Sequence, residues 1–251
     1  AHQMPPFLGQ GLCAAIRDAV NLVWKIDAVQ RLGCTDALLD TYGQERTPHV
    51  RTIVSHAKSF GLIIGELDQT AARSRDTHLM ELLASGKAET VRQKFIPGLD
   101  SGLIARDPSG QPITGAGSLF VQPWISDEDG TCTRLDDLTQ PGFLLASNVV
   151  DATTWLDART LQLWQRIEGQ QLQIRTPSSQ TGPELGVLTE RDGVFSAWLA
   201  SLDAKVVLVR PDRYVYGAAN NSQELQQMVL QLSQSLFGRV VVECATGAAT
   251  V

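Results

Sequence analysis

The sequence predicts an α/β protein, α+β overall, built from two units at residues 1–117 and 118–251. In the first unit, apolar residues recur every three or four positions over long stretches, which is typical of amphipathic helices. In the second unit, short apolar runs alternate with helical patterns, which favours a sheet covered by helices. The stretch richest in Gly, Pro and Ser lies at residues 107–118 and indicates the junction.

The first predicted helix runs from Gln10 to Leu32, and Gly33 is its expected C-cap. Arg17, Asp18, Asn21 and Lys25 lie largely off its apolar stripe. The stripe needs a partner layer, because the first unit has no strand of its own to cover. It consists of Leu12, Ile16, Ala19, Val23 and Ile26.

Further helical patterns follow in the first unit. A short helix is predicted over residues 35–42, and a new helix begins with Thr47 as N-cap and Pro48 at the first helical position. Another helical pattern covers residues 75–86. The helix that begins at Pro48 is expected to bury Val50, Ile53, Val54, Ala57, Phe60 and Ile64.

The second unit has an ordered rhythm of strands and helices. Two of its strands are separated by Pro211-Asp212, which is a hairpin signal. Its last helix has Ser222 as the expected N-cap. In chain order, the expected elements are a strand at 142–147, a helix at 152–169, a strand at 171–176, a helix at 193–202, strands at 205–210 and 213–218, and a helix at 222–237.

This order, β-α-β-α-β-β-α, resembles the thioredoxin fold. A thioredoxin places a CxxC pair just after the first strand, where this chain reads SNVVDATTW. Dithiol exchange needs two thiols, so we expect a redox-inactive, thioredoxin-like scaffold. The cysteines show no zinc-ligand spacing, so no metal site is predicted, and a reducing, cytoplasmic location is expected. They are Cys13, Cys34, Cys132 and Cys244.

Composition and charge exclude some partners. The 251 residues are 43% hydrophobic and 19% charged, and no apolar run reaches the roughly 18–20 residues of a membrane span. The net charge of −6 lies in the second unit, where 9 Lys/Arg stand against 15 Asp/Glu, compared with 12 and 12 in the first. A nucleic-acid binder would need a basic surface. We therefore expect neither a nucleic-acid nor a membrane partner.

The opening stretch AHQMPPFLGQGLC combines a stiff turn with a helix start. Pro5 and Pro6 remove two backbone donors, while Gly9 and Gly11 permit close approach to the backbone. The free N–H groups and positive dipole end of the helix suit an anionic or electron-rich ligand, such as a flat ring lying against Pro6. The alternative is a plain loop followed by a helix.

The longer string AHQMPPFLGQGLCAAIRDAVNLVWK resembles the second flavin-binding motif of the class A FAD-dependent aromatic hydroxylases. The segment YGQERTPH resembles the family segment that follows this motif. The thioredoxin-like tail without CxxC is similar to that of the phenol hydroxylase-type branch, and the form MPPF.GQG is most similar to the 3-(3-hydroxyphenyl)propionate hydroxylases. The resemblance spans nearly the whole chain.

The resemblance implies FAD as cofactor, NAD(P)H and O₂ as cosubstrates, and hydroxylation of a phenolic substrate, with no catalytic acid or base assigned in this chain. Pro6 would lie beside the reactive face of the flavin, and backbone N–H groups of the helix start would bond its pyrimidine edge. Met4 and Phe7 would border the substrate cavity, or simply pack there. The implied flavin-binding residues are Pro6, Gly9, Gln10, Gly11, Leu12 and Cys13.

One family feature is missing. The family begins with a βαβ unit that bears GxGxxG, and no GxGxxG occurs in these 251 residues. The resemblance thus implies the carboxyl-terminal half of a longer enzyme, whose partner is an amino-terminal half carrying GxGxxG. We expect this chain to be inactive alone and its helices to expose apolar surface.

Two other functions stay open. The thioredoxin-like unit could serve as a non-catalytic module that binds a partner or forms a homodimer, with Trp155, Trp164 and Trp198 as anchors. The same flavin motif could also serve a different flavin-dependent oxygenation, such as epoxidation.

Overall fold

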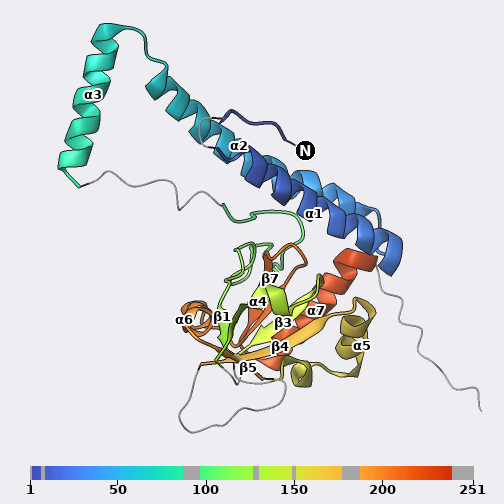
Figure 1. The fold of residues 1–251 in the computed structure, drawn as a ribbon. Coiled ribbons are helices and arrows are strands. Elements are labelled where there is room, and N and C mark those ends of the chain that lie inside the picture. Colours follow the sequence, from blue (N-terminus) through green and yellow to red (C-terminus); the bar gives the residue numbers. More distant parts are fainter. Residues whose placement is uncertain are drawn as a thin grey trace, which may run out of the picture.

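The computed structural model describes residues 2–6, 9–86, 97–126, 130–148, 151–176 and 187–238. Three helices, α1 to α3, precede a seven-stranded mixed sheet with helices on both faces (Figure 1). This architecture confirms the predicted fold class. Within the described ranges, no helix combines the length and the apolar character needed to cross a bilayer.

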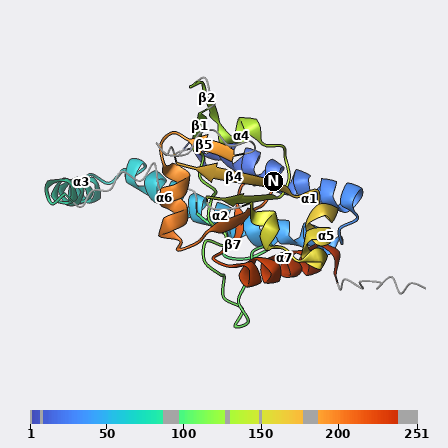
Figure 2. The same cartoon turned by 90° about the horizontal axis from the view of Figure 1, so that it is seen from below.

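Helix α1 spans Gly11–Leu32, as predicted to within one residue, and Gly33 ends it in the left-handed conformation with a φ of 69°. It lies beside α2, which spans Ala37–Ile64 (Figure 1). Helix α3, at Gln69–Ala84, extends away from the rest in both views, and none of its residues is buried (Figure 2).

The predicted helix start at Thr47 and Pro48 is wrong, because α2 continues through both residues. A proline inside a helix leaves the carbonyl group four residues earlier without its usual N–H donor. Here that carbonyl belongs to Gln44, and the hydroxyl of Ser101 donates a hydrogen bond to it at 2.9 Å. A distant loop therefore supplies the donor that Pro48 lacks, and the helix is not broken.

This compensation can be tested with a double-mutant cycle. Ser101→Ala is expected to lower the free energy of unfolding by about 0.5–1.5 kcal/mol, the usual net value of one hydrogen bond. In a Pro48→Ala background the cost should shrink, because the new N–H of residue 48 can bond the Gln44 carbonyl. Urea melts of the four proteins measure the coupling. Equal costs in the two backgrounds would refute the explanation.

The apolar stripe of α1 is exposed in the part of the chain that the structure describes. The side chains of Leu12 and Val23 are 73% and 62% exposed. The buried face instead holds Ala14, Asp18, Asn21, Lys25 and Ala28, and this polar burial was not foreseen. In α2, burial of Val50, Ile53 and Ala57 follows the prediction, whereas Ile64 is 70% exposed.

The sheet has the order β2-β1-β5-β4-β3-β6-β7. Strand β3 (Leu144–Ser147) pairs in parallel with β4 (Gln170–Arg175) and antiparallel with β6 (Val206–Val209), and β6 pairs antiparallel with β7 (Val215–Ala219). These four strands have the arrangement that the thioredoxin-like prediction requires. Helices α5 (Ala158–Arg166) and α7 (Ser222–Phe237) cover one face, and α6 (Val194–Ser201) covers the other (Figure 1).

Several short elements were not predicted. Strands β1 (Trp124–Ser126), β2 (Cys132–Arg134) and β5 (Val187–Glu190) extend the sheet beyond β4, and α4 (Leu135–Leu138) follows β2. Runs of three or four residues are too short to show a clear period.

Two helix starts also differ from the prediction. The helix predicted over 152–169 is a 3₁₀ turn at Ala152–Trp155 followed by α5, because Asp157 caps a fresh start by accepting from the N–H of Thr160. The N-cap of α7 is Asn221 rather than Ser222, since its side chain accepts from the N–H of Glu224 at 3.0 Å.

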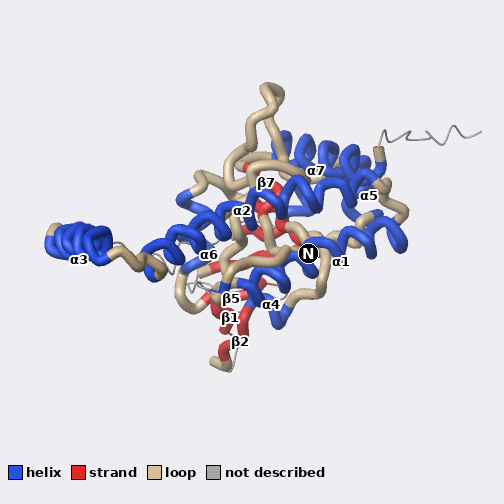
Figure 3. Tube along the Cα trace, turned by 90° about the horizontal axis from the view of Figure 1, so that it is seen from above, coloured by secondary structure: helices blue, strands red, loops and turns tan. Residues whose placement is uncertain are grey.

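Residues 99–118 run along the edge strand β7. The N–H of Ala105 donates to the carbonyl of Tyr216 at 2.8 Å, and Gly117 and Ser118 exchange hydrogen bonds with Val215 at 2.8 Å. This segment closes the sheet edge, which would otherwise present unpaired backbone groups. Seen from above, α1 and α2 lie across the second unit (Figure 3). The division at residue 117 stays a prediction.

Candidate functional site

The opening turn leads directly into an open helix end. The N–H of Gly9, a residue with a φ of 63°, donates to the carbonyl of Pro6 at 2.9 Å and closes the turn. Helix α1 has no side-chain cap and no acidic residue in its first turn. Among the described residues, the N–H groups of Gly11, Leu12 and Cys13 have no acceptor. They form a donor cluster beside the positive dipole end of the helix.

The predicted site residues therefore gather at one place. Pro6, Gly9 and Cys13 are exposed, and a Cβ added to Gly11 would lie 3.8 Å from the Cγ of Met4. Met4 thus covers the start of α1, whereas Phe7 lies outside the described residues. The roles of Gln10 and Leu12 toward a flavin, like those of the other residues, stay predictions.

A clasp formed by His2, Asp18 and Arg46 holds the opening turn. The backbone N–H of His2 donates to Oδ2 of Asp18 at 3.0 Å, and Nδ1 of the His2 ring lies 2.9 Å from the same oxygen. Nε of Arg46 donates to Oδ1 of Asp18 at 2.8 Å. Burial raises the pKa of Asp18, but the hydrogen bonds from Arg46 and His2 outweigh burial and lower it. The turn is thereby tied to α1 and α2.

Behind the clasp lies a buried network centred on Glu45 of α2. Its Oε2 accepts from Nδ2 of Asn21 at 2.7 Å and from Nζ of Lys25 at 2.7 Å. Nη1 and Nη2 of Arg210, from the end of β6, donate to its two oxygens at 2.9 and 2.8 Å. The side chains of Glu45, Lys25 and Arg210 are fully shielded from solvent.

Asp212 completes this network from the β6–β7 turn. It accepts from Nε and Nη2 of Arg210 at 3.0 and 2.7 Å and from Nδ2 of Asn21 at 2.8 Å. Two cations and two carboxylates therefore balance inside the protein. We call Asn21, Lys25, Glu45, Arg210 and Asp212 the inter-unit network.

The charges of the network shift each other's pKa values. Burial raises the pKa of Glu45, but Arg210 and Lys25 outweigh it and bring that pKa down to about 2. Burial lowers the pKa of Lys25 to about 8, although Glu45 opposes the shift. Burial likewise lowers the pKa of Arg210, but Asp212 and Glu45 reverse this and raise it. Since Glu45 and Arg210 hold their charges firmly, the network is a fixed structural element at neutral pH.

His49 of α2 lies close to the clasp and is 2% exposed. Burial, helped by the guanidinium groups of Arg46 and Arg17, lowers its pKa to about 4 from the ordinary 6.5. The unfolded chain therefore takes up this proton first as the pH falls. The stability that neutral His49 contributes is present above pH 6.5 and is lost between pH 6.5 and about 4.

This pH dependence gives a prediction. Over that range, His49 should contribute a slope of up to about 1.4 kcal/mol per pH unit to the free energy of unfolding. His49→Phe should remove this slope. Urea melts at half-unit steps of pH measure it, with His78→Phe on the exposed helix α3 as the matched control. An unchanged slope in His49→Phe would show that other groups set the acid response.

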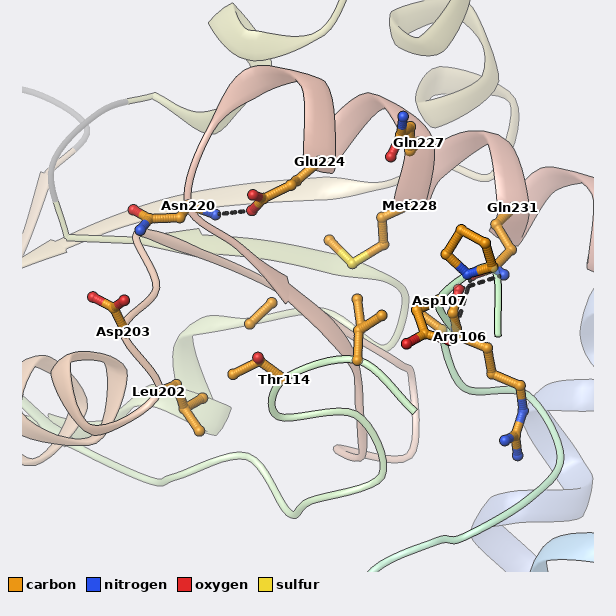
Figure 4. Close-up of a pocket in the computed structure, with 14 residues that line it drawn as sticks. Arg106, Asp107, Thr114, Leu202, Asp203, Asn220, Glu224, Gln227, Met228 and Gln231 are labelled. Carbon is orange, nitrogen blue, oxygen red and sulfur yellow. Dashed lines mark hydrogen bonds between the residues drawn. The ribbon is translucent and has the colours of Figure 1, made fainter. Parts of the chain in front are cut away.

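Two cavities lie elsewhere. An apolar groove of about 650 Å³ runs between α1 and residues 140–143 and is lined by Val20, Val23 and Trp24 among others. A second cavity of about 580 Å³ lies between α7 and the 105–114 loop (Figure 4). Around this second cavity, Glu224 accepts from the N–H of Asn220, and Gln231 bonds the backbone of Arg106. Neither cavity includes the predicted site residues at positions 4–13.

Two family models match this sequence. A model described as FAD binding domain matches residues 1–57, which contain the opening turn, the clasp and Glu45. A model described as HcaD C-terminal domain matches residues 117–235, which contain the seven-stranded sheet. The first match confirms FAD as the expected cofactor.

Two curated relatives cover nearly all of the chain. A probable NADH-specific resorcinol 4-hydroxylase of Rhodococcus jostii (strain RHA1) is 33% identical over 92% of this chain and 41% of the relative. A 3-(3-hydroxy-phenyl)propionate/3-hydroxycinnamic acid hydroxylase of Mycobacterium sp. (strain JLS) is 30% identical over 95% of this chain and 43% of the relative. The resemblance to the FAD-dependent aromatic hydroxylases is confirmed. The chain spans about two fifths of the length of these relatives.

A solved structure shows the same fold. The flavin-dependent monooxygenase PieE, in complex with FAD and substrate, matches with a TM-score of 0.65 at 23% identity, over 94% of this chain and 46% of PieE. The fold of this chain thus recurs within PieE.

The inter-unit network was not predicted from the sequence. Asp18, Asn21 and Lys25 fall at positions i, i+3 and i+7 of α1, which places them on one helical face. A charged face opposite an apolar stripe normally indicates a solvent-exposed surface. The Pro211-Asp212 turn was interpreted only as a hairpin signal. Arg210 and Asp212 stand on either side of Pro211, and two opposite charges so close together were the one sign in the sequence of a charged cluster at this turn.

Proposed function

We propose that this chain is the carboxyl-terminal part of a flavoprotein monooxygenase that hydroxylates a phenolic compound similar to 3-(3-hydroxyphenyl)propionate, using FAD, NAD(P)H and O₂. The observation that carries the proposal is the open donor end of α1, which lies within the segment matched by the FAD binding domain model. The names of the relatives support the class of reaction and the kind of substrate.

The residues at this end fit a flavin. The N–H groups of Gly11, Leu12 and Cys13 can donate to the oxygen and nitrogen atoms at the edge of the ring, and the helix dipole favours negative charge there. Pro6 offers a flat apolar surface, and Gly9 and Gly11 leave room for a ring to approach. FAD, when bound, would supply the redox and oxygen-transfer chemistry. The chain's own part is to bind and orient the ring.

We further propose that an amino-terminal half carrying GxGxxG covers the exposed stripe of α1. The stripe is apolar and regular, and no described segment of the chain covers it. Without that half, the ADP part of FAD has no GxGxxG to hold it, so this chain should be inactive alone. The exposed apolar side chains on α1 are Leu12, Ile16, Val20, Val23 and Ile26.

The alternative of a partner-binding or dimer-forming module has less support. Trp164 is 2% exposed and lies in the core. Trp198 packs edge-on against Phe120 with ring centroids 5.7 Å apart. Trp155 is partly buried and packs against the same core as Trp164, so all three proposed anchors are engaged inside the second unit. We also propose a reducing, cytoplasmic location; Cys13 is exposed and Cys34 is buried, and neither forms a disulfide within the described residues.

The test is to express the chain joined to its amino-terminal half. A yellow protein that retains FAD and consumes NAD(P)H and O₂ with a phenol would support the proposal, and a colourless protein that ignores phenols would overturn it. Gly9→Val should weaken FAD binding at least tenfold, because a β-branched residue strains the left-handed φ of 63° and crowds the ring. Gly43→Val, at an exposed position of α2, is the matched control.

A further inference from the structure

The thioredoxin-like unit reaches into the helical unit through two side chains. Arg210 and Asp212 stand on either side of Pro211, where β6 turns toward β7. Arg210 makes two hydrogen bonds to Glu45 and two to Asp212, and Nη1 also donates to the carbonyl of Leu103 at 2.8 Å. Asp212 in turn accepts directly from Asn21 of α1.

These contacts fix the orientation of α1 on the second unit as well as its distance from that unit. An apolar interface tolerates sliding, whereas paired hydrogen bonds between charged groups hold one geometry. A buried charge left without its partner is also strongly unfavourable, so alternative positions of α1 that break the network are disfavoured. The network therefore specifies how α1 lies on the second unit.

The open end of α1 is sensitive to this position. About 15 Å of helix separates Asn21 from Gly11, at 1.5 Å per residue. A tilt of roughly 5° at the network would therefore move the first-turn N–H groups by about 1 Å. Misplacement by 1 Å can cost about a hundredfold in rate. Other contacts of α1 with this unit lie farther from its open end. The Trp24 ring packs edge-on against Phe143 with centroids 5.6 Å apart, Arg31 pairs with Glu168, and the N–H of Thr35 donates to the carbonyl of Leu236 at 2.7 Å just past the helix.

We propose that Arg210 and Asp212 are positioning residues, through which the thioredoxin-like unit sets the place of the α1 donor cluster that contacts the flavin. The inference rests on the proposed function for the identity of the ligand. It gives the redox-inactive unit a role within the same protein. The unit would act on the flavin through α1, without touching it.

The test uses a charge-balanced pair of substitutions. Arg210→Met with Asp212→Asn removes one cation and one anion and leaves the ion pair of Lys25 and Glu45 in place, so the fold should be retained. The matched control is Arg213→Met with Asp136→Asn. Arg213 lies at the same hairpin and pairs with Asp136 of α4, with Nε 2.8 Å from Oδ1 and both side chains partly exposed.

The first measurement is hydrogen exchange on the 251-residue chain, which needs no flavin. We expect protection of the amides of residues 14–24 to fall at least tenfold in the Arg210/Asp212 variant, while amides of β3 and β6 keep theirs. The control variant should match the parent. Unchanged protection in α1 would overturn the inference.

The second measurement uses the intact, FAD-loaded protein. Displaced donors should stabilise the reduced, more negative flavin less, so the midpoint potential should fall by about 30 mV for each tenfold loss of relative affinity. If the variant changes hydrogen exchange in α1 and yet leaves the flavin midpoint potential and the flavin spectrum unchanged, Arg210 and Asp212 have only a structural role. The proposal that they position the donor cluster is then overturned. A parent protein that binds no FAD would overturn the proposed function, while the exchange result would still decide the coupling.

Discussion

Replacing Glu45 with Gln is expected to lower the free energy of unfolding by about 3–5 kcal/mol, the range found when one partner of a buried ion pair is removed. Glu45 is fully buried and accepts from Asn21, Lys25, Arg210 and the N–H of Leu103. A glutamine has a similar shape, but it leaves two buried cations facing only Asp212.

Urea melts followed by circular dichroism measure this loss. Asp27→Asn, which removes an exposed carboxylate of α1 paired with Arg31, is the matched control and should cost far less. In the parent, the contribution of Glu45 is present above pH 4.5 and is lost as the pH falls toward about 2. That part of the acid response should vanish in Glu45→Gln. Comparable losses for the two variants would contradict the central role of Glu45.

Charged residues in the apolar stripe of α1 should leave the chain alone stable but weaken its association with the proposed amino-terminal half. Ile16→Glu with Val23→Glu should leave the stability of the 251-residue chain within about 0.5 kcal/mol of the parent, because these side chains are 54% and 62% exposed. Once an amino-terminal half covers them, each would bury surface worth about 1.5–3 kcal/mol. The double variant should therefore weaken assembly at least a hundredfold.

Association of the chain with a separately expressed amino-terminal half, followed by calorimetry and by retention of FAD, measures this effect. Leu138→Glu, at a position 45% exposed in the second unit, is the control and should assemble normally. If the charged α1 variant assembled as tightly as the parent, the proposed cover of the stripe would be wrong. If the charged α1 variant unfolded without the amino-terminal half, the apolar stripe would already stabilise the 251-residue chain by itself.

The outline of the fold could be predicted because its signals are local. Gly33 ends α1 in the left-handed conformation that glycine adopts readily, and alternation of apolar strands and helices gave the β3-to-α7 order. The same reasoning failed at Pro48. The local rule that proline begins a helix was overridden by Ser101, a residue 53 positions later that supplies the missing hydrogen bond.

The candidate site divides in the same way. The turn from Pro6 to Cys13 is contiguous, so its residues could be named from the sequence and are close together by necessity. The inter-unit network joins Asn21 to Asp212 and Glu45 to Arg210 across 191 and 165 positions. The spacing of residues within one helix or strand cannot predict a contact between residues so far apart in the sequence.

The sequence by itself determined the class of fold, the helix that begins at the opening turn, and the resemblance to FAD-dependent aromatic hydroxylases. Only the tertiary structure decided which face of α1 is buried. An apolar stripe is ordinarily the buried face, but here it is exposed and Asp18, Asn21 and Lys25 are buried. The physical reason is that charged groups can be buried when distant partners neutralise and hydrogen-bond them, and Glu45, Arg46 and Asp212 become neighbours of α1 only when the chain folds.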